Sequence, residues 1–151
     1  MRWAIVLFLS LTCLAAQAPD GAPPKPLRER LLERALKGDA EAQFDLAKNY
    51  EAGRIGLPRD VVQAEHWYRL AAEQGEPFAQ ASLGILYQFG KGVKPDLVQA
   101  CMWYTLAVER TKSGDRETIM EMLDDLNERL TDGQRAEAKR LAREWKPRVT
   151  K

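Results

Sequence analysis

The sequence predicts an all-α protein built as an α/α solenoid, in which helix pairs stack on one another. The first observation is a repeat: the stretch from Ala42 to Glu73 recurs as Ala79 to Glu109, with fifteen identities over about thirty aligned positions. A fixed period of this size is typical of solenoids. The second observation is that, inside each copy, apolar residues recur at helical spacing and are interrupted by glycine and proline.

The first half of each copy predicts one helix. Ala42, Leu46 and Tyr50 follow one another at intervals of one helical turn and so share a face. Gly53 is suited to end this helix, and Pro58 cannot continue it. The second copy has the same residues at Ala79, Leu83, Tyr87, Gly90 and Pro95.

The second half of each copy predicts another helix. Asp60 is placed to cap its start, with Gln63 three residues later for a reciprocal capping box. Ala64, Trp67 and Ala71 share one face, where alanine allows a close helix contact and tryptophan fills the remaining space. The second copy repeats these features at Asp96, Gln99, Ala100, Trp103 and Ala107. Both tryptophans are therefore expected to be buried.

The flanking segments are expected to act as caps. Gly75 and Gly114 are predicted to end the two second helices, and residues 27–38 match the close of another second helix. Thr131 and Gln134 predict a capping box between two further amphipathic helices. Their apolar stripes are Ile119, Met122, Leu123, Leu126 and Leu130, then Ala138, Leu141, Ala142 and Trp145. Atypical terminal units of this kind cover the exposed end of a solenoid.

The repeats resemble those of the Sel-one-like repeat family, which is related to the tetratricopeptide repeat. The second copy, "AQASLGILYQFGKGVKPDLVQACMWYTLA", follows the family signature closely. The first copy has Ala47 where the signature has glycine, so its helix contact is expected to be slightly wider. The resemblance implies antiparallel helix pairs in a right-handed superhelix. We place the repeat domain at 27–146, with repeats at about 38–74 and 75–111 and capping helices at about 115–146.

The first 26 residues predict an export signal and a spacer. In residues 1–18, Arg2 precedes an apolar run of 12 residues and then an Ala-Gln-Ala pattern typical of signal peptidase sites. Because a membrane span needs about 20 apolar residues, we expect cleavage and no stable membrane insertion. Residues 19–26 are rich in proline and predict a flexible spacer. The short signal and the distribution of the family favour a bacterial protein that is periplasmic or secreted.

Neither the composition nor the motifs of the sequence indicate a catalytic site. The 23 basic and 22 acidic residues balance, which gives no electrostatic case for nucleic acid or an anionic membrane. His66 is the only histidine and has no partners at metal-ligand spacing, and Cys101 is the only cysteine once the signal is removed. We therefore predict no catalytic residue, no metal and no cofactor. The alternative is a small envelope-associated hydrolase that uses His66, Cys101 or an acidic strip.

The candidate recognition residues are those that differ between the copies while the core positions repeat. They are Phe44, Lys48, Glu51, Ala81, Ile85, Gln88 and Phe89. Because the concave side of a solenoid is its usual binding surface, we expect an exported adaptor that holds a protein or peptide in a groove lined by the first helices. Ile85 and Phe89 would anchor the partner, or else would pack on the terminal helix. A structural subunit of a larger assembly is a further alternative.

Two charged faces on the terminal helices leave their role open. Glu121, Asp125 and Glu128 follow one side of one helix, which is compatible with a cation site, an acidic docking strip or a solvated face. The basic face of the next helix consists of Arg135, Lys139, Arg143 and Lys146.

Overall fold

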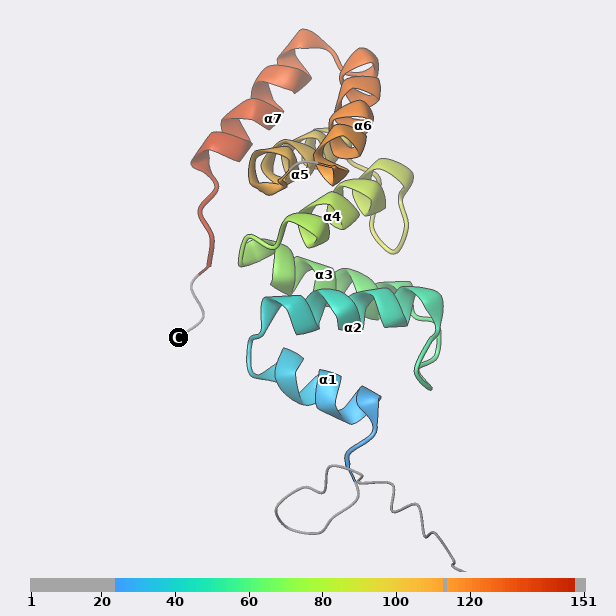
Figure 1. Ribbon diagram of the computed structural model, residues 1–151. Coiled ribbons are helices and arrows are strands. Elements are labelled where there is room, and N and C mark those ends of the chain that lie inside the picture. Colours follow the sequence, from blue (N-terminus) through green and yellow to red (C-terminus); the bar gives the residue numbers. More distant parts are fainter. Residues whose placement is uncertain (1–23, 113, 149–151) are drawn as a thin grey trace, which may run out of the picture.

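The computed structural model describes residues 24–112 and 114–148, and within these ranges the chain forms helices without any strand. The predicted signal and most of the predicted spacer lie outside the described residues. The helices are α1 (Leu27–Leu36), α2 (Ala40–Ala52), α3 (Val61–Glu73), α4 (Pro77–Phe89), α5 (Leu97–Arg110), α6 (Asp115–Arg129) and α7 (Asp132–Glu144). They follow one another along a single stack (Figure 1). The prediction of an all-α solenoid is confirmed.

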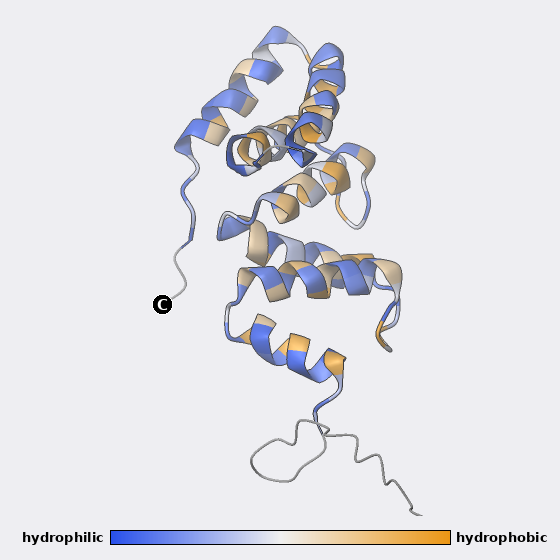
Figure 2. Cartoon of the chain, in the orientation of Figure 1, coloured by the Kyte–Doolittle hydropathy of each residue, from blue (hydrophilic) through white to orange (hydrophobic). Residues whose placement is uncertain are grey.

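Helices α1 to α5 pack in the order of the sequence. The pairs α2–α3 and α4–α5 are the two repeated units, and α3 packs on α4 to join them. At one end α1 packs on α2, and at the other end α6 and α7 both pack on α5. The middle helices are the more apolar ones, whereas α7 is largely hydrophilic (Figure 2). The terminal helices therefore cover the ends of one continuous core, as caps must.

The turn inside each unit depends on one glycine and one aspartate. Gly53 and Gly90 follow α2 and α4 in the left-handed backbone region, with φ of 66° and 68°, which glycine adopts without a steric penalty. The carboxylates of Asp60 and Asp96 then cap α3 and α5 by accepting backbone N–H groups.

The reciprocal half of the predicted capping box is wrong in both units. The backbone N–H of Asp60 donates to the carbonyl of Tyr50 at 2.9 Å, and that of Asp96 donates to the carbonyl of Tyr87 at 2.9 Å. The glutamine three residues later is not needed, because this N–H already ties the turn to the preceding helix.

The prediction for Gly114 is also wrong, whereas Gly75 does follow the end of α3. Helix α5 ends at Arg110, where the backbone N–H and the hydroxyl of Thr111 both donate to the carbonyl of Ala107 at 2.8 Å. A threonine hydroxyl competes for helix carbonyls in this way. Gly114 instead caps the start of α6, where its N–H donates to Glu117 at 3.0 Å.

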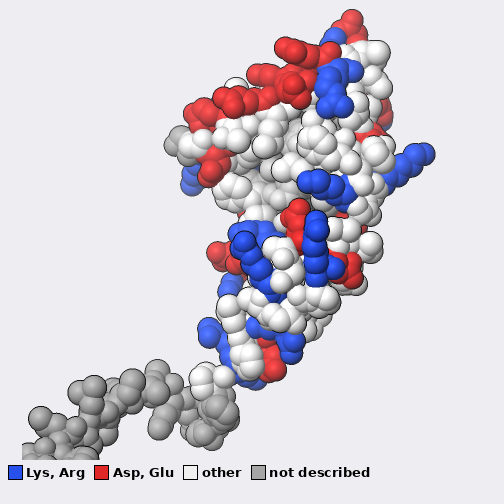
Figure 3. Space-filling view, turned by 90° about the vertical axis from the view of Figure 1, so that its right-hand side faces the viewer, with Lys and Arg blue, Asp and Glu red and all other residues white. Residues whose placement is uncertain are grey.

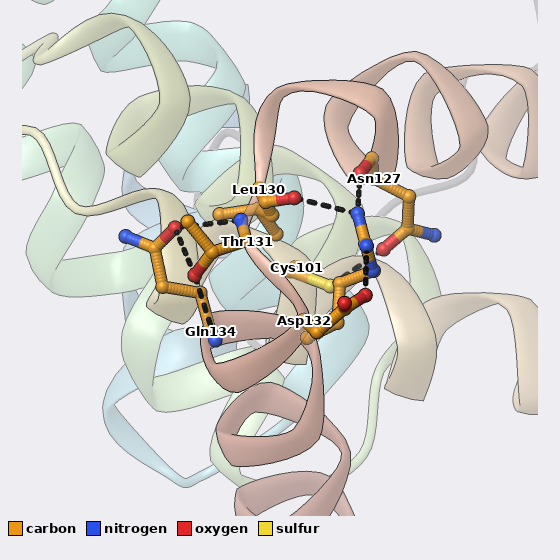
Figure 4. Close-up of polar contacts among 7 residues, drawn as sticks. Cys101, Asn127, Leu130, Thr131, Asp132 and Gln134 are labelled. Atoms are coloured by element: carbon orange, nitrogen blue, oxygen red, sulfur yellow. Dashed lines mark hydrogen bonds and ion pairs between the residues drawn. The ribbon is translucent and has the colours of Figure 1, made fainter.

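The turn from α6 to α7 forms as predicted. The hydroxyl of Thr131 accepts from the backbone N–H of Gln134 at 3.3 Å, and the Gln134 side chain accepts from the N–H of Thr131 at 2.9 Å. Arg135 adds to this turn by donating to the carbonyls of Asn127 and Leu130 at 2.5 Å (Figure 4). These contacts fix the direction in which α7 returns along α5.

The predicted core is confirmed at its tryptophans and alanines. Trp67 and Trp103 expose only 8% and 4% of their surface. Alanines fully buried between the helices are Ala64, Ala71, Ala100 and Ala107. Tyr68 and Tyr104 are also buried, and Tyr104 determines how closely α4 and α5 approach.

Tyr104 packs directly on the backbone of Gly84. A Cβ added to Gly84 would lie 2.5 Å from Cε1 of Tyr104, closer than side chains in contact ever come. In the first unit the corresponding position is Ala47, which is buried and retains its methyl group. The second unit is therefore packed too closely at this point for a methyl group, and the first is not.

We expect Gly84→Ala to lower the free energy of unfolding by up to about 2 kcal/mol. Overpacking against the buried Tyr104 ring costs about 1–3 kcal/mol, which outweighs the gain of about 1 kcal/mol in helix propensity. Urea titration measures the difference. In the control Ala47→Gly, stability should fall by about 2 kcal/mol, because the change lowers helix propensity and removes a buried methyl group without relieving any overpacking. A more stable Gly84→Ala protein would show that the contact is looser than described.

Replacement of the buried tryptophans should be severe. We expect Trp103→Ala, and likewise Trp67→Ala, to reduce the free energy of unfolding by about 3 to 5 kcal/mol through lost transfer energy and a cavity. The exposed Val62 provides the control, since Val62→Ala should change stability by less than about 0.5 kcal/mol. Denaturant midpoints for the three variants test this, and a loss below about 1 kcal/mol for both tryptophans would contradict the packing described.

Candidate functional site

Two neighbouring hollows open between α4 and α6 and share part of their lining. The larger, of about 360 Å³, is lined by Ile85, Gln88, Phe89, Tyr104, Glu121, Met122 and Asp125. The smaller, of about 220 Å³, lies toward α2 and is lined by Phe44, Phe78, Ala81, Ser82, Ile85, Asp115, Thr118, Ile119 and Met122. Ile85 and Met122 belong to both hollows. We call the combined surface the α4–α6 groove.

The floor of the groove is apolar. Ile85 and Met122 are half-buried against the core, one from α4 and one from α6. Phe89 is 61% exposed, because it is the last residue of α4 and no further helical turn covers it. Toward α2, the rings of Phe44 and Phe78 stack with centroids 6.1 Å apart. An apolar surface of this kind, open to water, is characteristic of a binding site.

A buried tyrosine from the second helix of each unit donates a hydrogen bond to a side chain of the first helix. The hydroxyl of Tyr68 donates to the carboxylate of Glu51 at 2.8 Å, and that of Tyr104 donates to the side-chain oxygen of Gln88 at 2.8 Å. Glu51 and Gln88 occupy corresponding positions of the two units. Two residues that we selected because they differ therefore share one structural role, since each supplies an oxygen acceptor.

Both tyrosines remain protonated donors at neutral pH. Burial raises the pKa of Tyr104 to about 12, and the negative charge of Asp125 contributes to the rise. Burial and the hydrogen bond to Glu51 likewise raise the pKa of Tyr68 above its ordinary value. The carboxylate of Asp125 therefore influences the pKa of a tyrosine that lines the groove.

The α6 side of the groove is negatively charged. Glu121 and Asp125 lie one helical turn apart, and both line the larger hollow. Among the described residues, no ion pair within 4 Å involves either carboxylate, in contrast to Glu137 and Glu144 of α7, which both pair with Arg140. Figure 3 shows the acidic side chains gathered toward the upper end of the stack and basic ones over its middle. The groove thus combines an apolar floor with an acidic rim.

Five of the seven predicted recognition residues line the groove. They are Phe44, Ala81, Ile85, Gln88 and Phe89. Lys48 lies outside both hollows, with its Nζ 5.1 Å from the Phe44 ring centre, and Glu51 lies outside them bonded to Tyr68. Ala81, which we expected outside the core, is buried, and its small side chain lines the smaller hollow.

Sequence reasoning missed the contribution of α6. Met122 belongs to the predicted apolar stripe of α6, and it also lines both hollows together with Ile85. Glu121 and Asp125 were noted as an acidic strip but were not connected to the groove. The available signal was their spacing of one turn, which places them on one side of the helix. The two alternatives for Ile85 and Phe89, which are anchors for a partner or contacts on the terminal helix, stay predictions: both residues line the larger hollow together with residues of α6.

The residues considered for catalysis are not arranged for it. The thiol of Cys101 is buried 3.5 Å from the side-chain oxygen of Asn127, and burial raises its pKa (Figure 4), whereas a nucleophilic cysteine requires a lowered pKa. The His66 ring packs edge-on against Trp67 at 5.3 Å. In the described ranges, no group of three or more His, Cys, Asp or Glu side chains could hold a metal ion. The same ranges contain no helix long and apolar enough to cross a membrane.

Comparison with known proteins identifies the repeat. The sequence model of the Sel1 repeat matches residues 40–76 and 77–111. A solved protective antigen of uropathogenic Escherichia coli, which displays an SLR fold, superposes with a TM-score of 0.71 at 34% identity, covering 78% of this chain and 24% of the antigen. A Sel1 repeat protein from Oxalobacter formigenes superposes with a TM-score of 0.62 at 30% identity, covering 72% of this chain and 41% of that protein. Residues 40–111 of this chain therefore form two Sel1 repeats.

Curated relatives match over the repeats alone. An ERAD-associated E3 ubiquitin-protein ligase component of Arabidopsis thaliana, HRD3A, is 39% identical over 59 residues, which is 39% of this chain and 9% of the relative. Chitin synthase regulatory factor 3 of Schizosaccharomyces pombe is 36% identical over 55 residues, which is 36% of this chain and 6% of that relative. The chain spans less than a tenth of the length of either relative. Proteins of the Sel1-repeat family are generally scaffolds for protein–protein interaction.

The raised pKa of Tyr104 provides a test of the groove's electrostatics. Since its pKa in the folded protein, about 12, exceeds the ordinary value of about 10, Tyr104 contributes stability that is present in full below about pH 10. This contribution is lost as the pH rises toward the folded value. Removal of the negative charge by Asp125→Asn should lower the pKa of Tyr104, so that more phenolate forms at about pH 11.

Tyrosinate absorbance, taken as the difference between each protein and its Tyr104→Phe counterpart, measures this pKa. Asp124→Asn is the control, because it removes the same charge from α6 outside the groove. Equal effects from Asp124→Asn and Asp125→Asn would show that the Asp125 carboxylate is not directed into the groove.

Proposed function

We propose that this protein is an exported adaptor that binds a protein or peptide partner in the α4–α6 groove. The observation that carries the proposal is the apolar hollow of about 360 Å³ beside Phe89, an aromatic side chain that is 61% exposed. Aromatic residues at the centre of an interface commonly carry much of the binding energy. The general role of the Sel1-repeat family in protein–protein interaction supports the same conclusion.

The proposed site of action is the bacterial periplasm or the outside of the cell. The support comes from the sequence of residues 1–18, with its short apolar run followed by Ala-Gln-Ala. The likeness to solved bacterial proteins of the same fold, from Escherichia coli and Oxalobacter formigenes, agrees with a bacterial origin. The envelope hydrolase considered above is disfavoured by the burial and raised thiol pKa of Cys101.

A second candidate function, a subunit of a larger assembly, is favoured by one observation at the α1 end. Leu27, Leu32 and Leu36 are exposed on this helix. The sequence of α1 matches the close of a second helix, and among the described helices α2 is the one it packs on most. The exposed face would be covered if another helix docked on the end of the stack.

Capture of partners from the envelope fraction of the source cell separates the two candidates. Phe89→Ser removes the aromatic side chain from the groove, and Leu36→Ser removes an exposed leucine from α1. The two residues are matched, since each is the last residue of its helix, with 61% and 69% of its surface exposed. Neither change should shift the melting temperature by more than about 2 °C, because neither removes a buried contact.

We expect Phe89→Ser to reduce capture of the partner about thirtyfold, as loss of a central anchor does, and Leu36→Ser to leave it unchanged. The opposite result would favour assembly through α1. If both variants capture the partner as well as the unchanged protein does, the groove is not the binding surface.

A further inference from the structure

We infer that the segment bound in the α4–α6 groove carries an apolar side chain next to a lysine or arginine, whose cation binds Glu121 and Asp125. This inference rests on the proposed function and specifies the chemistry of its partner. The partner is a basic, apolar peptide segment.

The apolar part of this chemistry follows from the floor of the groove. Ile85, Phe89 and Met122 present carbon surface from two helices to the same hollow. The polar groups that also line it, on Gln88 and Tyr104, are bonded to each other at 2.8 Å. The floor therefore offers its best contact to an aliphatic or aromatic side chain, which would replace water over these three residues.

The cationic part follows from the rim. Glu121 and Asp125 are like charges one turn apart, an arrangement that weakens a helix unless a cation lies between them. No ion pair within 4 Å neutralises either one in the part of the chain that the structure describes, whereas Arg140 of α7 lies between Glu137 and Glu144. A lysine or arginine of the partner would take the place on α6 that Arg140 takes on α7.

The charges around the groove also set the direction of the bound segment. On the α4 side, Nζ of Lys91 lies 5.8 Å from the centre of the Phe89 ring. The negative rim on α6 and this positive charge beside Phe89 create a field across the groove. The partner's cation is therefore directed toward α6, and an acidic segment would be repelled from that wall.

A display library of random peptides of about a dozen residues, selected on the purified protein, tests the inference without a known partner. Enriched peptides are synthesised with a fluorophore, and their affinities are measured by polarisation. The charge variant is Glu121→Gln with Asp125→Asn. Its control is Asp124→Asn with Glu128→Gln, which removes two charges from the same helix outside the hollow. Phe89→Ser reports whether a peptide occupies the groove.

The inference expects enriched peptides with lysine or arginine beside an apolar residue. Their affinity should fall about fivefold in the charge variant at low salt, with little change in the control, and the difference should shrink as salt is raised toward about 1 M. Substitution of the peptide's basic residue by glutamine should lower the affinity by the same factor.

Two results would overturn the inference, and they differ in what they leave standing. Peptides that lose affinity in Phe89→Ser but lack a basic residue, or bind the charge variant equally well, would contradict the inference and leave the proposed function intact. A selection that enriches no peptide sensitive to Phe89→Ser would contradict both.

Discussion

The inner surface of this solenoid depends on the contact between Tyr104 and the backbone of α4. The ring lies so close to Gly84 that a Cβ would sit 2.5 Å from it, and this sets the distance between α4 and α5. The hydroxyl orients Gln88 through a bond of 2.8 Å, and the ring itself lines the larger hollow. One buried side chain therefore joins the packing of the repeat to the shape of the candidate site, so a change in the core at this point changes the surface as well.

The cap at the end of the stack has two tasks. A solenoid needs terminal helices that cover its last repeat, and α6 and α7 do so by packing on α5. Helix α6 also forms the second wall of the groove, through Met122 on the floor and Glu121 and Asp125 on the rim. With two repeats in the chain, the cap thus supplies a large share of the inner surface. Its carboxylates give the α6 side of the groove a negative charge.

The helices and the core could be predicted from the sequence because they depend on local and repeated features. Trp67 and Trp103 recur at one period and are both buried. The errors occur where a second partner competes for the same group: Thr111 ends α5 before Gly114, and the carbonyl of Tyr50 takes the N–H of Asp60. The site was only partly predictable. Comparison of the copies cannot reveal that Glu51 and Gln88 share an acceptor role, or that α6, which lies outside the repeat, faces α4.

The central claim is that α4 and α6 together form the surface on which the partner lies. Hydrogen–deuterium exchange, measured with and without the captured partner and resolved to individual helices, tests it most directly. The account predicts slower exchange in the last turns of α4 and along α6, with α3 and α7 unchanged. Slower exchange in α3 or α7, with α4 and α6 unaffected, would place the partner on another face and contradict the account.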